Sequence, residues 1–322
     1  MTEAPLPRDG LVCVTGALGF VGSHLCHALA ERGYWVRAVD CLRGSYATGA
    51  GVGAAVELDA LDAVEIVHAD VAVDPLPPLL DGTSAVIHLA GLPGVRSHHS
   101  FGELWAQNTR AAARVAAAGG AGRRFVLASS SSVYGNAARL PAAEDCPPSP
   151  LNPYAASKVA AEGECLATAR SHGTDVVIAR LFTVFGPAQR PDMAFAGWID
   201  SIVHGRPAQW CAGAEARREF TYVGDAVRGL VAALERGRAG EAYNIAGTGS
   251  VPVRDALAEI ETLLGRRARL ARHTVPSEAV ATAACGAKSA AELEYVPEIE
   301  LREGLELQVE ATVARSSARA AA

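Results

Sequence analysis

The sequence has 322 residues, of which 50% are hydrophobic and 20% charged, and its formal net charge is -6. This composition is typical of a globular protein large enough to bury a ligand pocket, and it excludes the strongly basic surface with which proteins bind nucleic acid. No apolar run is long enough to cross a membrane, and the first residues (MTEAPLPR) lack the apolar core of a signal peptide, so we expect a cytoplasmic protein with a small-molecule partner.

Between residues 10 and 128, short apolar runs alternate with longer stretches that have the composition of helices. The runs are LVCVTG, WVRAVD, VEIVHAD, AVIHLAG and RFVLASSS. This alternation predicts βα units around a parallel sheet, and so a doubly wound α/β fold of the Rossmann type. Further along, DVVIARL predicts a sixth strand and AYNIAG another.

The first run leads into the segment TGALGFVGSH, in which Gly16, Gly19 and Gly22 are spaced three residues apart. In a strand–turn–helix unit the first glycine allows a tight turn, the second lets backbone N–H groups approach a pyrophosphate, and the third lets the helix pack closely on the strand. Asp40 ends the second run, where a carboxylate accepts hydrogen bonds from the adenosine ribose and repels a 2′-phosphate. The segment therefore predicts a dinucleotide site that prefers NAD to NADP.

Polar residues follow the later runs. Asp70 and Val71 come after the third run and are placed to meet the adenine, although an ordinary aspartate at a strand end is an alternative. The fifth run ends in four serines, residues 129–132. Because the carboxyl ends of parallel strands share one edge of the sheet, we expect these hydroxyl groups where the ligand binds.

The segment NPYAASKVAAEGECLATARSHG, which begins at residue 152, predicts a helix. Tyr154 and Lys158 lie one helical turn apart on the same face of this helix. A free tyrosine, with a pKa of ~10, is a poor base at neutral pH, and a nearby ammonium group favours its phenolate form. The pair is a candidate general base with its activating cation; two amphipathic side chains on a helix surface are the alternative.

The remaining sequence gives weaker signals. Residues 183–218 are rich in Gly, Pro, Trp and Phe without a clean period, which favours loops that line a pocket. The last hundred residues predict helices in VGDAVRGLVAALERG and RDALAEIETLLG, and we expect residues 311–322 to be a disordered tail.

The pairs His24/His27 and His98/His99 have no acidic or sulfur ligand at suitable spacing, so no metal site is expected. The cysteines are scattered and odd in number, which indicates reduced thiols rather than disulfides: Cys13, Cys26, Cys41, Cys146, Cys165, Cys211 and Cys285.

The motifs TGALGFVG, HLAG, SSSSVYG, YAASK and REFTYVGD occur in an order and spacing that resemble the extended short-chain dehydrogenase/reductase family, specifically its nucleotide-sugar epimerases and dehydratases. The resemblance covers about residues 10 to 308 and implies a Rossmann domain, a smaller mixed α/β substrate domain and NAD as cofactor. Residues 9–180, joined by 221–248, would bind NAD; 181–220 and 249–310 would bind the nucleotide sugar. Two alanine-rich helices, 103–118 and 153–170, resemble the pair that forms a four-helix homodimer interface in this family.

The resemblance also implies roles for individual residues. Tyr154 as phenolate would take the proton of the sugar 4-hydroxyl, Lys158 would support it and hold the nicotinamide ribose, and Ser130 would bond the reacting oxygen, with Ser131 as its substitute. Contacts with NAD are implied for Gly16, Gly19, Phe20, Val21, Gly22, Asp40, Asp70, Val71, Leu89, Ala90, Gly91, Asn108, Tyr154 and Lys158. Contacts with the substrate are implied for Arg96, Ser131, Thr183, Arg190, Trp210, Arg218, Arg272 and Glu278.

Two substrate-side segments carry most of the expected specificity. Thr183 and Arg190 match positions that contact the C6 carboxylate in UDP-glucuronate 4-epimerases, and the planar fork of arginine suits a carboxylate, although an arginine that only supports its loop is the alternative. Arg218 is expected to pair with the diphosphate. The next residue, usually Asp in the family, is Glu219 here. Cys211 stands where an aromatic residue commonly stacks on the base, so either the adjacent Trp210 stacks there or the base is held differently.

The residues after Ser130 decide which reaction we expect. Dehydratases of the family usually place acidic residues at the next two positions and decarboxylases tend to keep a glutamate there, but this chain has Ser131 and Ser132. A hydroxyl is a poor replacement for a carboxylate as proton acceptor. We therefore predict an NAD-dependent 4-epimerase of a nucleotide sugar, with UDP-glucuronate to UDP-galacturonate as the favoured reaction. A dehydratase, a decarboxylase or an NAD-binding protein without catalysis is the alternative.

Overall fold

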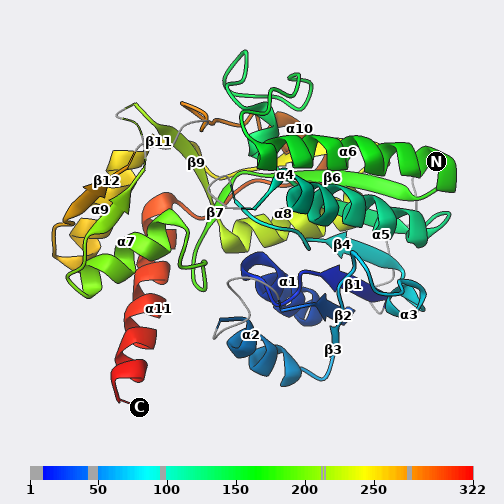
Figure 1. The fold of residues 1–322 in the computed structure, drawn as a ribbon, viewed down its shortest axis with the longest axis horizontal. Coiled ribbons are helices and arrows are strands. Elements are labelled where there is room, and N and C mark those ends of the chain that lie inside the picture. Colours follow the sequence, from blue (N-terminus) through cyan, green and yellow to red (C-terminus); the bar gives the residue numbers. More distant parts are fainter. Residues whose placement is uncertain are drawn as a thin grey trace.

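A computed structural model describes residues 10–42, 50–94, 99–211, 213, 215–273 and 278–321. Its main sheet has seven strands in the order β10-β6-β5-β4-β1-β2-β3, and every neighbouring pair is parallel (Figure 1). The doubly wound Rossmann fold predicted from the sequence is confirmed. The strands are β1 (Leu11–Thr15), β2 (Trp35–Asp40), β3 (Val64–His68), β4 (Ala85–His88), β5 (Arg124–Ser130), β6 (Asp175–Leu181) and β10 (Ala242–Ile245).

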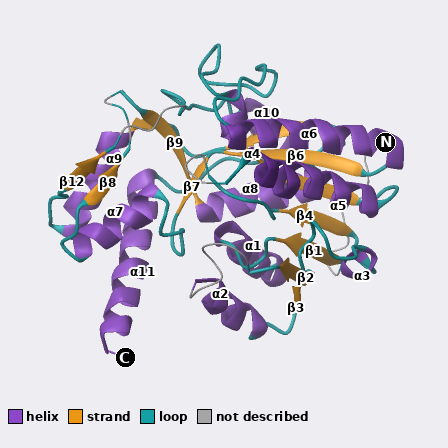
Figure 2. Ribbon diagram, viewed as in Figure 1, coloured by secondary structure: helices purple, strands orange, loops and turns teal. Residues whose placement is uncertain are grey.

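Helices cover both faces of this sheet (Figure 2). Alternate strand residues face opposite helices: Val12 and Val14 pack in one buried cluster with α1 and α8, while Cys13 packs in another with α5 and α6. Among the described residues, no helix combines the length and apolar character needed to cross a bilayer. The helices around the sheet are α1 (Phe20–Glu31), α2 (Ala50–Asp59), α3 (Pro77–Leu80), α4 (Phe101–Leu104), α5 (Ala111–Gly119), α6 (Pro153–His172), α8 (Val223–Arg236) and α10 (Ala287–Leu293).

A second region with its own hydrophobic core lies beside the main sheet (Figure 1). It contains the sheets β11-β9-β7 and β12-β8. Its elements are β7 (Thr183–Phe185), α7 (Ala194–Val203), β8 (Ala208–Trp210), β9 (Arg217–Tyr222), β11 (Ser250–Pro252), α9 (Val253–Leu264), β12 (Leu270–Arg272) and α11 (Leu301–Ala321).

This region corrects the expectation that residues 183–218 form loops. Strands β7 and β8 are three residues long, too short to show a period in the sequence. Helix α7 does carry a helical pattern, because its buried residues follow the i, i+3, i+4, i+7 spacing of an amphipathic helix: Phe195, Trp198, Ile199 and Ile202. That pattern was present in the sequence and was missed.

The expected disordered tail is also helical. Helix α11 continues through residues 311–321. Leu305 and Val309 anchor its first half in the second core, and the alanine and arginine residues beyond them are strong helix formers. Composition alone suggested disorder because the alanine-rich end carries no apolar stripe.

Candidate active site

The glycine-rich turn between β1 and α1 is shaped to hold a phosphate group. Gly16 has a φ of +71°, and a Cβ there would lie 2.7 Å from the Ala90 nitrogen; a Cβ on Gly22 would lie 2.1 Å from the Gly16 carbonyl oxygen. Both positions therefore require glycine. A Cβ on Gly19 would meet only the Gly16 oxygen, at 3.1 Å, so this glycine leaves open the space in front of the helix N-terminus. These residues fit the pyrophosphate of a dinucleotide.

Asp40 stands at the end of β2 beside this turn. One carboxylate oxygen accepts the Leu18 N–H at 3.0 Å and the other accepts the Leu42 N–H at 2.8 Å. Asp40 thus shapes the turn in addition to the ribose role expected for it. Phe20 and Val21 pack in a small cluster with Val184, which ties the turn to the second region.

Asn108 connects the segment that follows β4 to helix α6. This residue lies in a π-helical segment, Trp105–Arg110, between α4 and α5, and π-helical turns are frequent at functional sites. Its side-chain oxygen accepts the Leu92 N–H at 2.7 Å and its nitrogen donates to the Ser157 hydroxyl at 3.0 Å. A Cβ on Gly91 would lie 2.7 Å from that Asn108 oxygen and 4.0 Å from the Lys158 nitrogen. Leu89, Ala90 and Gly91 therefore border both the glycine turn and Lys158.

The predicted catalytic helix begins beside this edge. Asn152 caps α6 by accepting the Ala155 N–H at 2.9 Å, and Pro153 opens its first turn. Lys158 is buried, and its ammonium group donates to the Ala128 carbonyl at 2.9 Å. Tyr154 is half-buried one turn earlier, and its carbonyl accepts the Ser157 hydroxyl at 2.7 Å. A carbonyl group fixes the position of this ammonium without neutralising it. Its positive charge therefore remains available to the phenol of Tyr154, one helical turn away.

The serines lie at the end of β5 as expected. The Ser130 hydroxyl accepts the Ser132 N–H at 3.2 Å and the Ser132 hydroxyl at 3.0 Å, and Ser131 is buried in the short 3₁₀ turn that follows. Ser130 pairs in register with Leu181, two residues before Thr183. The chain passes from β6 into β7 through Phe182 alone, so Thr183 necessarily lies next to this edge.

Asp70 and Val71 follow β3 and are both buried. One Asp70 oxygen accepts the Ala72 N–H at 2.9 Å, and the Val71 carbonyl accepts the Arg114 guanidinium at 2.7 Å. The turn they form is therefore held from both sides. Their expected contact with the adenine remains a prediction.

Arg190 lies on the loop after β7, the loop expected to contact the sugar. Its guanidinium makes two parallel hydrogen bonds with Asp192, of 2.9 and 2.8 Å, and its side chain is 14% exposed. Gln189 fixes the loop next to it, because its amide group donates to the Val184 carbonyl and accepts the Ala196 N–H. The arginine thus presents the fork geometry that reads a carboxylate, and in this structure the carboxylate is that of Asp192.

Arg218 on β9 pairs with Glu278 at 3.0 Å, so two predicted substrate residues lie together. Glu278 begins a segment, residues 278–285, that runs along β9: the Arg217 N–H donates to Val280 and the Thr282 N–H to Arg217. The segment also reaches the loop before α6, since the Ala142 N–H donates to Ala283.

Three further substrate residues were predicted, and the structure describes two of them. Trp210 is buried against Trp198, with ring centroids 5.5 Å apart, so its ring belongs to the core and this placement argues against stacking on a base. Arg272 is exposed on β12. Arg96 lies outside the described residues.

Sequence reasoning missed the buried groups that support the site. Glu162, one turn beyond Lys158 on α6, binds Arg180 at 2.7 and 3.0 Å and accepts the Ser129 hydroxyl at 2.5 Å. The His88 ring lies under the glycine turn, 2.8 Å from the Thr15 hydroxyl, and burial lowers its pKa to about 3, so it stays neutral. A polar residue among apolar strand positions was the available signal. Within the described residues, no group of three or more His, Cys, Asp or Glu is arranged to hold a metal ion.

Known proteins share this arrangement over nearly the whole chain. A UDP-glucuronate 4-epimerase of Bacillus cereus, solved with UDP-glucuronic acid and NAD, superposes with a TM-score of 0.90 at 33% identity, covering 95% of this chain and 99% of that one. The uncharacterized UDP-glucose epimerase YtcB of Bacillus subtilis (strain 168) is 34% identical over 91% of this chain and 95% of its own length. The UDP-glucuronate 4-epimerase of Thermodesulfobacterium geofontis (strain OPF15) is 31% identical over 93% and 95%. Residues 12–246 match the family described as NAD dependent epimerase/dehydratase, and the chain belongs to that family.

Proposed function

We propose that the protein interconverts UDP-glucuronate and UDP-galacturonate by inverting the configuration at C4 of the sugar. The protein is an NAD-dependent nucleotide-sugar epimerase, and the proposal adds the identity of the sugar. The observation that carries it is the Arg190 guanidinium, which lies on the loop after Thr183 and already holds a carboxylate through two hydrogen bonds. Relatives named UDP-glucuronate 4-epimerases recur among the similar proteins, which supports the same sugar.

The residues of the chain divide the chemistry among them. When bound, NAD supplies reversible oxidation at C4. Tyr154 takes the proton of the 4-hydroxyl and returns it after the sugar has turned over. Lys158 holds positive charge one turn away and favours the phenolate, and the Ser130 hydroxyl orients the sugar oxygen. Glycine at positions 16, 19 and 22 leaves room for the pyrophosphate.

The diphosphate and the carboxylate of the substrate have separate anchors. Arg218 is buried enough, at 14% side-chain exposure, to hold the diphosphate while the sugar rotates. Arg190 then captures the C6 carboxylate, for which Asp192 is the internal stand-in. Residues 181–220 and 249–310 form the proposed nucleotide-sugar domain, and residues 9–180 with 221–248 the proposed NAD domain.

Product analysis tests the proposed substrate. The purified protein is incubated with UDP-glucuronate, UDP-glucose and UDP-N-acetylglucosamine in separate reactions, and the products are identified by proton NMR of the C4 configuration. We expect UDP-galacturonate to form at the highest kcat/KM. Release of carbon dioxide with a UDP-pentose, or a stable keto sugar, would establish the decarboxylase or dehydratase alternative instead. Failure to epimerise UDP-glucuronate while epimerising UDP-glucose would remove the proposed sugar and leave the epimerase intact.

We further propose a homodimer formed through the helices at 101–119 and on α6. Phe101 is 54% exposed at the start of α4 and packs beside Trp105, with ring centroids 5.6 Å apart, while α5 presents small alanine side chains that allow close helix packing. Sedimentation velocity tests this: Phe101→Ser is expected to shift the protein toward monomer, and an unchanged sedimentation coefficient would contradict the interface.

The cytoplasmic location stays a prediction.

A further inference from the structure

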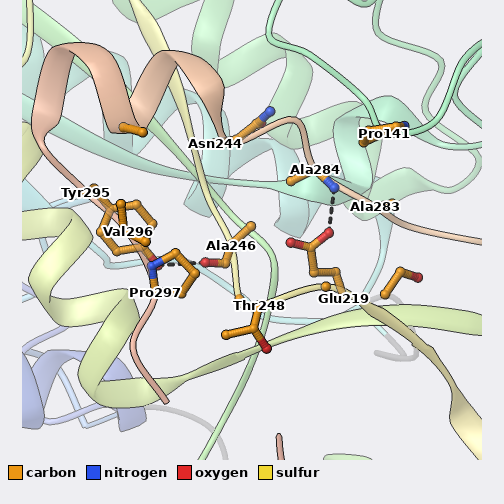
Figure 3. Close-up of a pocket in the computed structure, with 15 residues that line it drawn as sticks. Pro141, Glu219, Asn244, Ala246, Thr248, Ala283, Ala284, Tyr295, Val296 and Pro297 are labelled. Atoms are coloured by element: carbon orange, nitrogen blue, oxygen red, sulfur yellow. Dashed lines mark hydrogen bonds between the residues drawn. The ribbon is translucent and has the colours of Figure 1, made fainter. Parts of the chain in front are cut away.

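A cavity of about 430 Å³ lies between β9, the loop that follows β10, and the chain around α10 (Figure 3). Its walls include Glu219, Ser250 and Tyr295. Neither the glycine turn nor Tyr154, Lys158 or Ser130 lines it. The cavity is therefore separate from the site already described.

The cavity lies behind the strand that carries Arg218. In antiparallel pairing, directly opposite residues place their side chains on the same face of a sheet. Glu219 is opposite Ser250, and Arg218 is opposite Val251. Neighbouring residues alternate between faces, so Glu219 and Ser250 face the cavity while Arg218 and Val251 face away from it.

The carboxylate of Glu219 in this cavity has no cation beside it among the residues that the structure describes. Glu219 is 4% exposed, and one of its oxygens accepts the Ala284 N–H at 2.5 Å, as drawn in Figure 3. No lysine, arginine or histidine is among the described residues that line the cavity. Arg217, two residues earlier on β9, directs its guanidinium to the Ser250 carbonyl at 2.6 Å. Burial raises the pKa of the Glu219 carboxyl to about 7, because nothing positive offsets the loss of water.

The rest of the lining is complementary to a short, mostly apolar molecule with a hydroxyl group. The Ser250 hydroxyl oxygen is buried and has no hydrogen-bond partner among the described residues. Tyr295 is the other titratable group of the lining, and its hydroxyl already donates to the Ala246 carbonyl at 2.7 Å (Figure 3). Pro141, Val296 and Pro297 supply apolar walls.

We propose that this cavity binds a small primary ammonium compound, with the ammonium group on Glu219 and a hydroxyl group on Ser250. The positive charge of the ammonium group would compensate the buried carboxylate. One of its three N–H groups could donate to the Glu219 oxygen that Ala284 leaves unoccupied. The same carboxylate repels phosphates and sugar acids, so the nucleotide sugar itself is excluded as the occupant.

An occupant would act on the nucleotide side through residues 278–285. The Glu219 backbone N–H donates to the Thr282 hydroxyl at 3.1 Å, and its carboxylate holds Ala284. The first residue of this segment, Glu278, is the partner of Arg218. Ionised Glu219 binds the Ala284 N–H more strongly than the neutral acid does, so the ligand would fix the segment that positions Arg218.

Matched probes test the proposal on the full chain with NAD bound. The ligand is 4-aminobutan-1-ol, and butane-1,4-diol is its neutral counterpart, both titrated in a phosphate buffer free of amines. We expect the aminoalcohol to raise Tm saturably by about 2 °C, since it binds only the folded state, and the diol to have no such effect. Glu219→Gln should abolish the shift. Glu310→Gln, the same change at an exposed position on α11, should retain it.

An equal shift from the diol, no saturable shift in the wild-type protein, or an unchanged shift in Glu219→Gln would overturn the proposal. If Glu219→Gln does not fold, Glu219→Asp keeps the charge and should keep the preference for the ammonium probe over the diol. Loss of that preference in a folded Glu219→Asp, or an empty cavity in crystals of the wild-type protein soaked in the aminoalcohol, would likewise overturn the proposal. An ammonium group seen beside Glu219 in those crystals would support it.

Discussion

The ammonium of Lys158 is held by the Ala128 carbonyl, and this choice of partner matters for the chemistry of its neighbour. A carbonyl fixes the position of the ammonium without neutralising its charge, whereas a carboxylate would cancel it. The place of this cation, one helical turn from Tyr154, is determined by the end of β5. The same strand ends in Ser130, so one element positions both the cation and the hydroxyl proposed to orient the sugar.

Replacing Tyr154 by Phe tests the base at the scale of one atom. Only the phenol oxygen is removed, so we expect kcat to fall by roughly 10²–10⁴-fold, the usual contribution of a general base. NAD should still bind, because the glycine turn is untouched. Steady-state kinetics and the NAD content of the purified variant measure the two effects. Activity within a factor of two of wild type would show that another group takes the proton.

Glu219 makes stability depend on pH. Its folded-state pKa, about 7, lies above the ordinary value of 4.5, so the native state binds the proton more tightly than the unfolded state. The stabilisation from that proton is complete below about pH 4.5 and is lost as pH rises through about 7, a change of about 3 kcal/mol. Glu219→Gln cannot titrate. We expect its unfolding free energy, relative to wild type, to increase between pH 5 and pH 8 in urea titrations; parallel pH profiles would contradict the assignment.

Helix α11 contacts residues that lie more than a hundred positions earlier in the sequence. Gln308 is 1% exposed; its side chain accepts the Gly186 N–H at 3.1 Å and donates to Gln189 at 2.9 Å. One turn earlier, a Cβ on Gly304 would lie 2.7 Å from the Phe185 ring, so only glycine lets the helix approach β7 this closely. Helix α11 therefore holds the loop that carries Arg190.

Replacing Gln308 by Met removes both hydrogen bonds at nearly constant volume. The buried Gly186 N–H loses its partner, which should cost about 1–3 kcal/mol of unfolding free energy. Because the loop also carries Arg190, we expect KM for UDP-glucuronate to rise several-fold while kcat changes little. Glu310→Met, exposed two residues later on the same helix, is the control and should alter neither. A loss of stability with unchanged KM would mean that the helix supports only the core.

The elements also show what the sequence could and could not predict. The glycine turn, the Tyr154/Lys158 pair and the serines depend on local spacing, and each lies on the element expected for it. The Gln189–Gln308 pair joins residues 119 positions apart, and Glu162–Arg180 pairs two charges that look like surface residues in a helix and a strand. Such contacts exist only once the fold brings the elements together, so no local pattern indicates them. The burial of Trp210 was not predicted for the same reason: its neighbour Trp198 lies on another element.

At the scale of the whole molecule, the proposed reaction requires the main sheet and the second region to act on one substrate. They are joined where β6 passes into β7 through the buried Phe182, and Phe20 of α1 packs with Val184 across the same junction. The end of β5, which carries Ser130, and the loop that carries Arg190 are thus held together by a short, buried connection. This construction suits the proposed mechanism, in which one end of the substrate stays anchored at Arg218 while the sugar turns above Tyr154.

If C4 is oxidised and reduced again within one binding event, a hydrogen isotope placed at C4 stays with the sugar. The protein is given UDP-glucuronate carrying deuterium at C4, and the product is examined by NMR and mass spectrometry. We expect UDP-galacturonate that retains the deuterium at C4, with no carbon dioxide released. Inversion with loss of the deuterium to solvent, or a product that has lost C6, would contradict it.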